Sequence, residues 1–174
     1  RIGCEVAFAV EIFGSRRSAS TMANAMLAGA VPAFAMLLVY LPIPRILDRY
    51  DPEPWWCLLM AFVWGAVVAT GVAGLVNSGV HVYAAHAIGP SRGELVTVVV
   101  SAPVVEETMK SMIVWGFFFF LRREFDGVVD GIIYATFSAL GFSAVENVSY
   151  YARAALEGQD VFAATFFLRG VVAP

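Results

Sequence analysis

Charged side chains are scarce in this sequence of 174 residues. Only 14% of the residues are Asp, Glu, Lys or Arg, whereas about 25% is usual for a soluble domain. Hydrophobic residues make up 60% of the chain, and the mean hydropathy is +0.76. This composition excludes an ordinary soluble protein and predicts a membrane protein whose surroundings are the lipid bilayer.

The sequence also lacks an excess of basic charge and a cysteine framework. Its 11 Lys and Arg against 14 Asp and Glu leave a net charge of −3, so nucleic acid is not expected as a partner. Cys4 and Cys57 lie 53 positions apart and fit neither a disulfide framework nor a CxxC metal motif. We expect both to be free thiols in apolar surroundings.

Long apolar stretches separate the few charges. A helix of about 20 residues crosses a hydrocarbon core about 30 Å thick. We therefore predict an all-α, polytopic helical membrane protein with four transmembrane spans and a truncated fifth. The predicted spans are 25–43, 55–85, 95–121, 127–152 and the partial 161–174. We expect residues 1–24 to be an N-terminal interfacial segment or the end of an earlier span, and 25–174 to be one helical membrane domain.

The two ends of the sequence predict a fragment of a longer protein. It begins at Arg1 rather than Met, and it stops at Pro174 within an apolar pattern.

The bias of Lys and Arg in short loops normally predicts the orientation of a membrane protein. Here these residues divide evenly between the two sides, so the orientation stays open.

Three charged residues lie inside the third predicted span, where each costs at least a few kcal/mol. Glu106 lies about 16 Å into that span at about 1.5 Å per residue, near the middle of the bilayer. Lys110 follows Glu107 by three residues and Glu106 by four, so it shares a helix face with both. One carboxylate can pair with Lys110 while the other serves chemistry. An ion-pair network that only fixes helix packing is the alternative.

The fourth predicted span carries a second polar cluster. Glu146 and Asn147 lie deep in it, and Asp126 and Asp130 lie near its start. Glu146 is about 160° around an ideal helix from Asp130, so the two acids share a face only if the helix bends, for instance at Gly141. For Asp126 and Asp130, a helix cap or an interfacial role is as good an interpretation as catalysis.

The two clusters meet if the third and fourth spans form a hairpin that turns near Arg123. Glu146 then lies level with about Ser101, which is roughly 7 to 8 Å along the axis from Glu106. Side chains of a kinked helix pair can bridge this distance. We therefore expect one polar site near the middle of the membrane.

Two further patterns concern packing. Gly127 and Gly131 form a GxxxG pattern that permits a neighbouring helix to approach closely. Aromatic residues near the predicted span ends are typical of interfacial belts; they are Trp55, Trp56, Tyr150 and Tyr151.

Four motifs, in order, resemble those of the PrsW family of bacterial intramembrane proteases, which is related to the CAAX-processing and bacteriocin-processing membrane endopeptidases. They are D-R-Y-D-P-E-P-W at 48–55, E-E-x-x-K at 106–110, F-D-G-x-x-D-G-I-I-Y at 125–134 and G-F-x-x-x-E-N at 141–147. The resemblance covers about residues 35–174. It implies a multi-pass, metal-dependent protease of the bacterial plasma membrane. Its substrate would be a membrane-anchored protein such as an anti-sigma factor.

The resemblance also implies roles for single residues. Glu106 and Glu107 would be the catalytic carboxylates, one activating water and the other binding metal or orienting the site. Lys110 would balance their charge. Glu146 and Asn147 would complete the polar cluster as metal ligands.

Supporting roles and one missing ligand follow from the same resemblance. Asp126 and Asp130 would support the site. The family pattern calls for a histidine on the next helix, after a segment that looks like Arg169, Gly170 and Pro174, so a further His is expected beyond Pro174. The implied cofactor is a divalent metal, zinc.

Hydrolysis of an amide inside a membrane has requirements that do not depend on the resemblance. It needs water, a nucleophile made from it and stabilisation of the oxyanion, and a metal with a carboxylate base supplies all three. A carboxylate-based proton or ion transporter is one alternative. A non-catalytic sensor or scaffold subunit, in which the polar cluster only holds helices together, is another. Inverted repeats would favour the transporter, and the sequence shows none.

Overall fold

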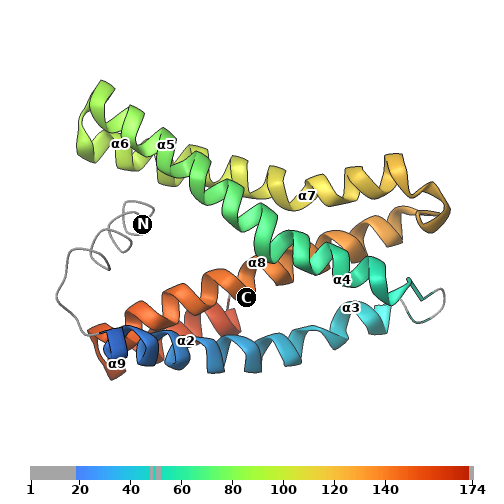
Figure 1. Ribbon diagram of the computed structural model, residues 1–174, viewed down its shortest axis with the longest axis horizontal. Helices are drawn as coiled ribbons and strands as arrows, with labels where there is room; N and C mark the ends of the chain where they lie inside the picture. Colours follow the sequence, from blue (N-terminus) through green and yellow to red (C-terminus); the bar gives the residue numbers. More distant parts are fainter. Residues whose placement is uncertain (1–18, 48, 50–51, 173–174) are drawn as a thin grey trace.

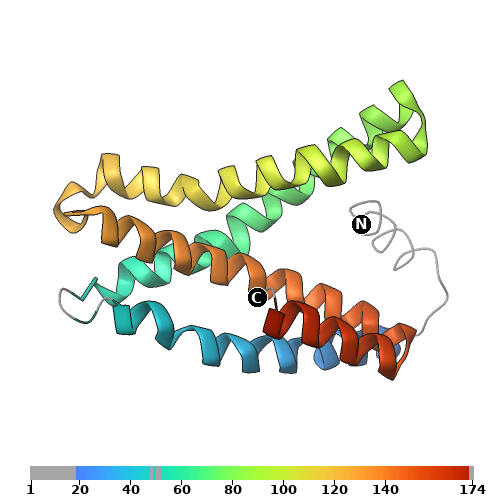
Figure 2. The same ribbon diagram turned by 180° about the vertical axis from the view of Figure 1, so that it is seen from behind.

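The computed structural model of the protein describes residues 19–47, 49 and 52–172. Its helices run back and forth along the long axis of the molecule (Figure 1), and Figure 2 shows the same arrangement from behind. In chain order the elements are α2 (Ala19–Tyr40), α3 (Pro42–Leu47), α4 (Trp55–Val63), the π-helix η1 (Trp64–Ala69), α5 (Thr70–Ile88), α6 (Pro90–Val96), the π-helix η2 (Thr97–Ser101), α7 (Ala102–Phe120), the 3₁₀ turn η3 (Arg122–Glu124), α8 (Val128–Glu157), α9 (Gln159–Phe167) and the π-helix η4 (Leu168–Val172).

The all-α prediction is confirmed for the described residues, all of whose regular elements are helices. Among the described residues, three helical stretches are long and apolar enough to cross a membrane, namely Ser20–Ile46, Trp55–Ile88 and Val128–Glu157. The path from α6 through α7 is of similar length, but Glu106, Glu107 and Lys110 interrupt its apolar character. The chain is therefore a multi-pass integral membrane protein.

The observed helices extend several predicted spans. The path that was expected at 55–85 continues to Ile88, and the one expected at 127–152 continues to Glu157. Residues 19–24 of the predicted N-terminal segment belong to α2. Residues 1–18, which include Cys4, lie outside the described residues.

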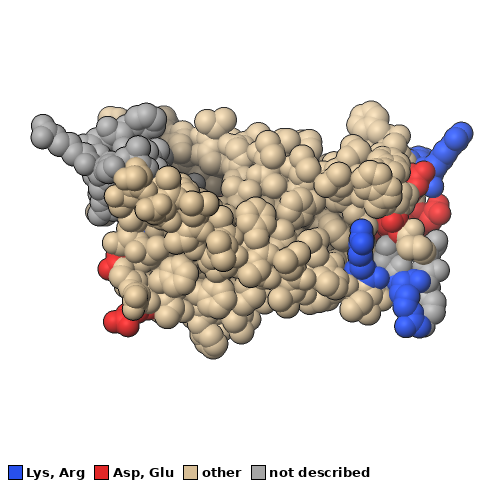
Figure 3. Space-filling view, turned by 60° about the horizontal axis from the view of Figure 1, so that its bottom comes forward, with Lys and Arg blue, Asp and Glu red and all other residues tan. Residues whose placement is uncertain are grey.

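Glycines make the turns at one end of the molecule. Gly89, between α5 and α6, has a φ of 93°, and Gly158, between α8 and α9, has a φ of 141°. Side-chain-bearing residues rarely adopt this backbone region, so glycine permits a helix to end and the next one to start within a residue or two. Figure 3 shows that the Lys, Arg, Asp and Glu side chains on one face lie toward the two ends, with surface from other residue types between them.

Helix α8 is the central element, because it contacts α2, α4, η1, α7 and α9. Two glycines bring it against the second helical path without intervening side chains. A Cβ on Gly65 of η1 would lie 1.8 Å from the carbonyl oxygen of Ser138, and a Cβ on Gly141 of α8 would lie 2.1 Å from that of Phe62. Backbone contact of this kind is the usual basis of close helix pairs in membranes.

The predicted GxxxG contact is wrong for its first glycine. Gly127 precedes α8 as its N-cap residue, and a Cβ there would meet only the backbone nitrogen of Val129, at 3.9 Å. Gly131 faces the side chains of Phe125 and Val114. The spacing matches the pattern, but the helix starts too late for both glycines to share a helical face.

A core between α4, α7 and α8 holds the end of the molecule near the α7–α8 turn. Cys57 is free and fully buried in it, as predicted. The buried members of this core are Cys57, Leu58, Ala61, Ile113, Phe117, Ile133, Tyr134 and Phe137. This packing fixes the hairpin that carries the candidate site.

Candidate active site

Helix α7 presents the acidic pair and the lysine, which we call the α7 cluster (Glu106, Glu107 and Lys110). Lys110 Nζ lies 2.8 Å from Glu107 Oε1, so the predicted ion pair is confirmed for Glu107. The Glu107 side chain is 73% exposed, whereas that of Lys110 is 18% exposed. Lys110 Nζ also lies 4.3 Å from the ring centroid of Phe142 on α8. The ammonium thus bridges two helices and leaves its partner carboxylate open to the surroundings.

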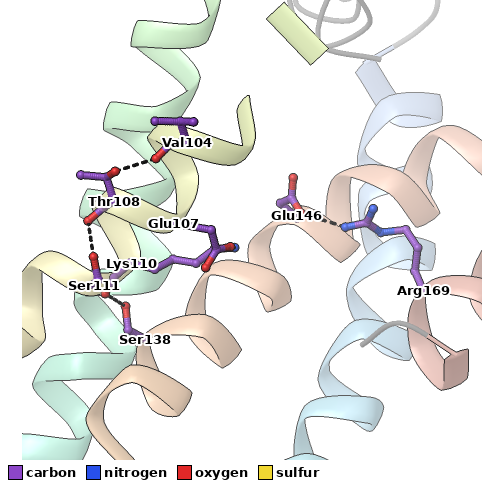
Figure 4. A network of polar contacts seen from close by, with 8 residues as sticks. All are labelled: Val104, Glu107, Thr108, Lys110, Ser111, Ser138, Glu146 and Arg169. Carbon is purple, nitrogen blue, oxygen red and sulfur yellow. Dashed lines mark hydrogen bonds and ion pairs between the residues drawn. The ribbon is translucent and has the colours of Figure 1, made fainter. Parts of the chain in front are cut away.

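Two neighbouring elements hold the backbone of α7 at this cluster. Ser138 Oγ of α8 donates to the carbonyl of Lys110 over 2.9 Å, and Trp64 Nε1 of η1 donates to the carbonyl of Met109, also over 2.9 Å. The Ser138 bond is drawn in Figure 4. Since Gly65 and Gly141 allow η1 and α8 to touch, both donors lie beside α7. The two glycines therefore help to position the α7 cluster, because they let the helices that carry these donors pack closely.

The hydroxyl groups near Glu107 are satisfied within α7 itself. Thr108 Oγ1 donates to the carbonyl of Val104 at 2.6 Å, and Ser111 Oγ donates to that of Thr108 at 2.9 Å. Thr108 lies next to Glu107 in the sequence and is also exposed. The polar character of this part of α7 therefore comes from its charged groups.

Helix α8 and the segment after it form a second cluster, the α8–η4 cluster (Glu146, Asn147 and Arg169). Arg169 donates from a terminal nitrogen to Glu146 Oε2 over 2.8 Å and from Nε to Asn147 Oδ1 over 2.9 Å. The Glu146 and Arg169 side chains are 21% and 29% exposed, and Asn147 is buried. The two residues that the sequence predicted as metal ligands thus share an arginine.

The register of α7 on α8 is close to the predicted one. The Ser138 bond places Lys110 level with Ser138, so Glu146, eight residues further along α8, lies level with about residue 102. Glu106 is then offset from Glu146 by about 6 Å along the axis, against the 7 to 8 Å that the sequence predicted. In Figure 4 the side chains of Glu107 and Lys110 extend from α7 toward the side on which Glu146 lies.

Asp126 and Asp130 are not brought to either cluster. Asp130 Oδ2 accepts the backbone N–H groups of Asp126 at 2.6 Å and Gly127 at 2.7 Å, which is a helix cap. Asp130 lies 16 residues before Glu146 on one continuous helix, a distance of about 24 Å. These hydrogen bonds fit the alternative interpretation, in which the two aspartates cap the start of α8.

Sequence reasoning missed Trp64, Ser138 and Tyr40. The hydroxyl of Tyr40 on α2 donates to the carbonyl of Gly170 over 2.6 Å, which ties α2 to η4. A polar atom in an apolar span was the only available signal for these residues, and it does not say which backbone group the atom will meet.

The sequence motifs at 48–55 and 125–134 meet near the N-terminal end of α8. The hydroxyl of Tyr134 hydrogen-bonds to the carboxylate of Glu53 and lies 2.9 Å from the carbonyl oxygen of Glu124. Glu53 belongs to the connector before α4, and Glu124 belongs to the α7–α8 turn. This contact fastens the connector to the hairpin that carries the α7 cluster.

A metal centre was predicted from the sequence, and the described residues do not form one. Among residues 19–47, 49 and 52–172, no three His, Cys, Asp or Glu side chains gather to hold a metal ion. Open zinc sites generally use three protein ligands. One carboxylate oxygen of Glu146, Oε2, and the amide oxygen of Asn147 already accept hydrogen bonds from Arg169.

The chain is similar to known proteases over most of its length. Residues 53–174 match the family described as PrsW family intramembrane metalloprotease. Protease PrsW of Geobacillus kaustophilus is 31% identical over 123 residues, which are 71% of this chain and 50% of the relative. Protease PrsW of Oceanobacillus iheyensis is 28% identical over 133 residues, which are 74% of this chain and 54% of the relative.

These comparisons have a defined extent. The chain spans about half the length of the two curated relatives. No solved structure matches it. The family match includes both polar clusters and the Glu53–Tyr134 contact. On this match, the chain belongs to the PrsW family of intramembrane metalloproteases.

Proposed function

We propose that the protein is an intramembrane protease in which Glu106 and Glu107 activate water to hydrolyse a peptide bond of a membrane-anchored protein. The observation that carries this proposal is the α7 cluster itself. A carboxylate that is 73% exposed on a helix of an apolar bundle is costly in a bilayer, and a catalytic role explains why it is kept. An anti-sigma-factor-like protein is the proposed class of substrate.

The chemistry needs one proton acceptor and one balancing charge. One of the two carboxylates accepts a proton from water, and the water oxygen then attacks the carbonyl carbon of the scissile bond. The same carboxyl group returns the proton to the leaving nitrogen as the carbon–nitrogen bond breaks. Lys110 stays close enough to balance negative charge that develops during the attack, because it is held against Glu107 and Phe142.

We propose that the membrane part has four spans and the start of a fifth. The path from α6 to α7 lies alongside the recognised apolar helices from one end of the molecule to the other (Figure 1). The segment α9–η4 returns from the Gly158 turn along α8. The cost of placing the α7 charges in the bilayer is reduced by the Glu107–Lys110 pair.

We also propose that the full-length protein uses a divalent metal, zinc. The family's description as a metalloprotease implies a metal, and catalytic zinc combines histidine or carboxylate ligands with water. Elemental analysis of the purified full-length protein tests this. Stoichiometric zinc supports the proposal, and a fully active preparation without bound metal contradicts it.

The catalytic roles are tested by co-expressing the full-length protein with an anti-sigma-factor-like single-pass substrate. The variants are Glu106→Ala and Glu107→Ala, with Glu157→Ala at the exposed end of α8 as the matched control. We expect both test variants to reach the membrane in normal amounts and to lose cleavage, whereas the control cleaves like the wild type. Wild-type cleavage by the folded test variants would refute the proposal and favour a scaffold.

A further inference from the structure

Arg169 makes an unusually complete set of contacts for a residue near the middle of a helical bundle. Two of its nitrogens donate to Glu146 and Asn147, at 2.8 and 2.9 Å. The central carbon of its guanidinium, Cζ, lies 3.7 Å from the ring centroid of Tyr150. The carboxylate, the amide and the aromatic ring that surround the guanidinium all come from one short stretch of α8.

The geometry of these walls selects a planar, forked cation. A guanidinium carries several N–H donors in one plane and also stacks on aromatic rings, whereas an ammonium is a point charge. The amide of Asn147 is oriented for this role, since its nitrogen donates to Ser143 Oγ at 3.3 Å and its oxygen faces Arg169. Asn147 is only 6% exposed, so its oxygen depends on a partner from the protein.

The same segment is also held from the opposite side. The carbonyl of Gly170 accepts the hydroxyl of Tyr40 at 2.6 Å, and a Cβ on Gly170 would lie 3.0 Å from the hydroxyl oxygen of Tyr151. A cavity of about 20 Å³ adjoins these groups and is lined by Tyr40, Asn147, Arg169 and Gly170 among others. The backbone beside Arg169 is therefore fixed by α2 while its side chain is fixed by α8.

We infer that the Glu146–Asn147 pair is a guanidinium-binding site filled by Arg169, and not a pair of metal ligands. Arg169 is a positioning residue: it fixes the Glu146 carboxylate, which lies about 6 Å from Glu106 along the helix axis, and it holds η4 against α8. A metal ion bound to the same two oxygens would face the positive charge of Arg169, which lies within hydrogen-bond distance of both. The consequence for cleavage rests on the proposed function, whereas the binding of a guanidinium does not.

Chemical rescue tests this inference directly. Arg169→Ala is introduced into the full-length protein, which is reconstituted in lipid nanodiscs. Its unfolding temperature and its cleavage of the anti-sigma-factor-like substrate are measured alone and with millimolar ethylguanidinium, ethylammonium or zinc. Arg122→Ala is the matched control, because Arg122 also lies over an aromatic ring, 5.3 Å from the Phe118 centroid, but at the exposed α7–α8 turn.

We expect Arg169→Ala to lower the unfolding temperature by roughly 5 °C or more and to reduce cleavage at least tenfold. Ethylguanidinium should restore most of both losses, whereas ethylammonium and zinc should not. Arg122→Ala should unfold and cleave like the wild type. If ethylammonium or zinc rescues as well as ethylguanidinium does, or if Arg169→Ala loses nothing, the inference is overturned.

Arg169→Lys keeps the inference testable if the alanine variant does not fold. It retains the charge but loses the fork, so we expect an unfolding temperature and a cleavage rate between those of the wild type and the alanine variant. Wild-type values for both would show that only the charge matters. Since unfolding is measured without substrate, a failure of the proposed protease activity would leave the rescue of stability readable.

Discussion

The two polar clusters of this membrane protein are built in opposite ways. The ion pair of the α7 cluster is formed within one helix, between residues three positions apart, and it leaves Glu107 largely exposed. The α8–η4 cluster joins two segments that are 23 positions apart and leaves its carboxylate mostly covered. The Glu107–Lys110 pair lies within one helix and keeps the Glu107 carboxylate accessible. The Glu146–Arg169 pair joins two segments, and Glu146 Oε2 and Asn147 Oδ1 both accept hydrogen bonds from Arg169.

This difference separates two roles that the sequence alone cannot distinguish. Both clusters combine acids with a base in apolar surroundings, and both fall in motifs of the family. Their contacts fit the two proposed roles, chemistry for the α7 cluster and positioning for the α8–η4 cluster. Variants that affect one cluster and spare the other test whether the two roles are separate.

The largest effect is expected from Gly141→Ala. A new Cβ would lie 2.1 Å from a carbonyl oxygen on the neighbouring path, so the helices that support the α7 cluster must separate. We expect a loss of about 3 kcal/mol or more in the free energy of unfolding, measured by denaturation of the full-length protein. Gly71→Ala, where a Cβ would meet nothing within 4 Å, is the control and should change stability by less than about 1 kcal/mol. Equal effects of the two variants would show that the close contact is unimportant.

Lys110→Met tests whether the α7 lysine takes part in the reaction. The substitution keeps most of the length of the side chain, one atom less, but removes the charge that faces Glu107 and the Phe142 ring. We expect cleavage to fall roughly 100-fold, which corresponds to about 2.7 kcal/mol of transition-state stabilisation. Lys110→Arg should recover part of the rate in the same assay. A methionine variant that cleaves at the wild-type rate would leave Lys110 with a packing role only.

Ser138→Ala removes one of the two bonds that hold the backbone of α7. The hydroxyl is buried and donates to the carbonyl of Lys110, so its loss should destabilise the protein by about 1 kcal/mol and slow cleavage a few-fold. Thr136→Val is the matched control, because its hydroxyl bonds only to the carbonyl of Ile132 in its own helix. If both variants behave alike in unfolding and cleavage, the Ser138 bond does not position the site.

Asp130→Ala should have the smallest effect and should spare cleavage. It deletes a cap that accepts two backbone N–H groups, and such losses cost about 1 kcal/mol or less in an exposed turn. Asp130→Asn, which keeps an acceptor oxygen, should be closer to the wild type in unfolding experiments. A drop in cleavage of more than tenfold in a stable alanine variant would instead support the catalytic role that the resemblance implies.

Much of the architecture could be predicted because the charges are few. Groups of charged residues mark the ends of the helices. The predicted turn near Arg123 placed Glu146 level with Ser101 of the neighbouring helix, within one residue of the level that the Ser138 bond indicates. Hydrophobicity does not encode which glycines touch a partner, so Gly65 and Gly141 were missed and Gly127 was given a contact that it does not make.

The interior contacts between segments were harder to predict. Tyr151 was expected in an interfacial belt, but it is fully buried, and its ring lies against those of Phe162 and Phe166. The contact of Arg169 with Glu146 joins α8 to the segment that follows the turn at Gly158. The two hydrogen bonds of Arg169 depend on how α9 packs against α8. Such contacts depend on tertiary packing that no periodicity of the sequence specifies.

We propose that the α7 cluster performs chemistry while the α8–η4 cluster fixes structure. The most direct test is to measure the cleavage rate and the unfolding temperature on one preparation of full-length Glu107→Gln. We predict a rate lower by a factor of about 10² to 10⁴, with an unfolding temperature within about 2 °C of the wild type. A wild-type rate together with a marked fall in the unfolding temperature would contradict the account, because Glu107 would then be a packing residue.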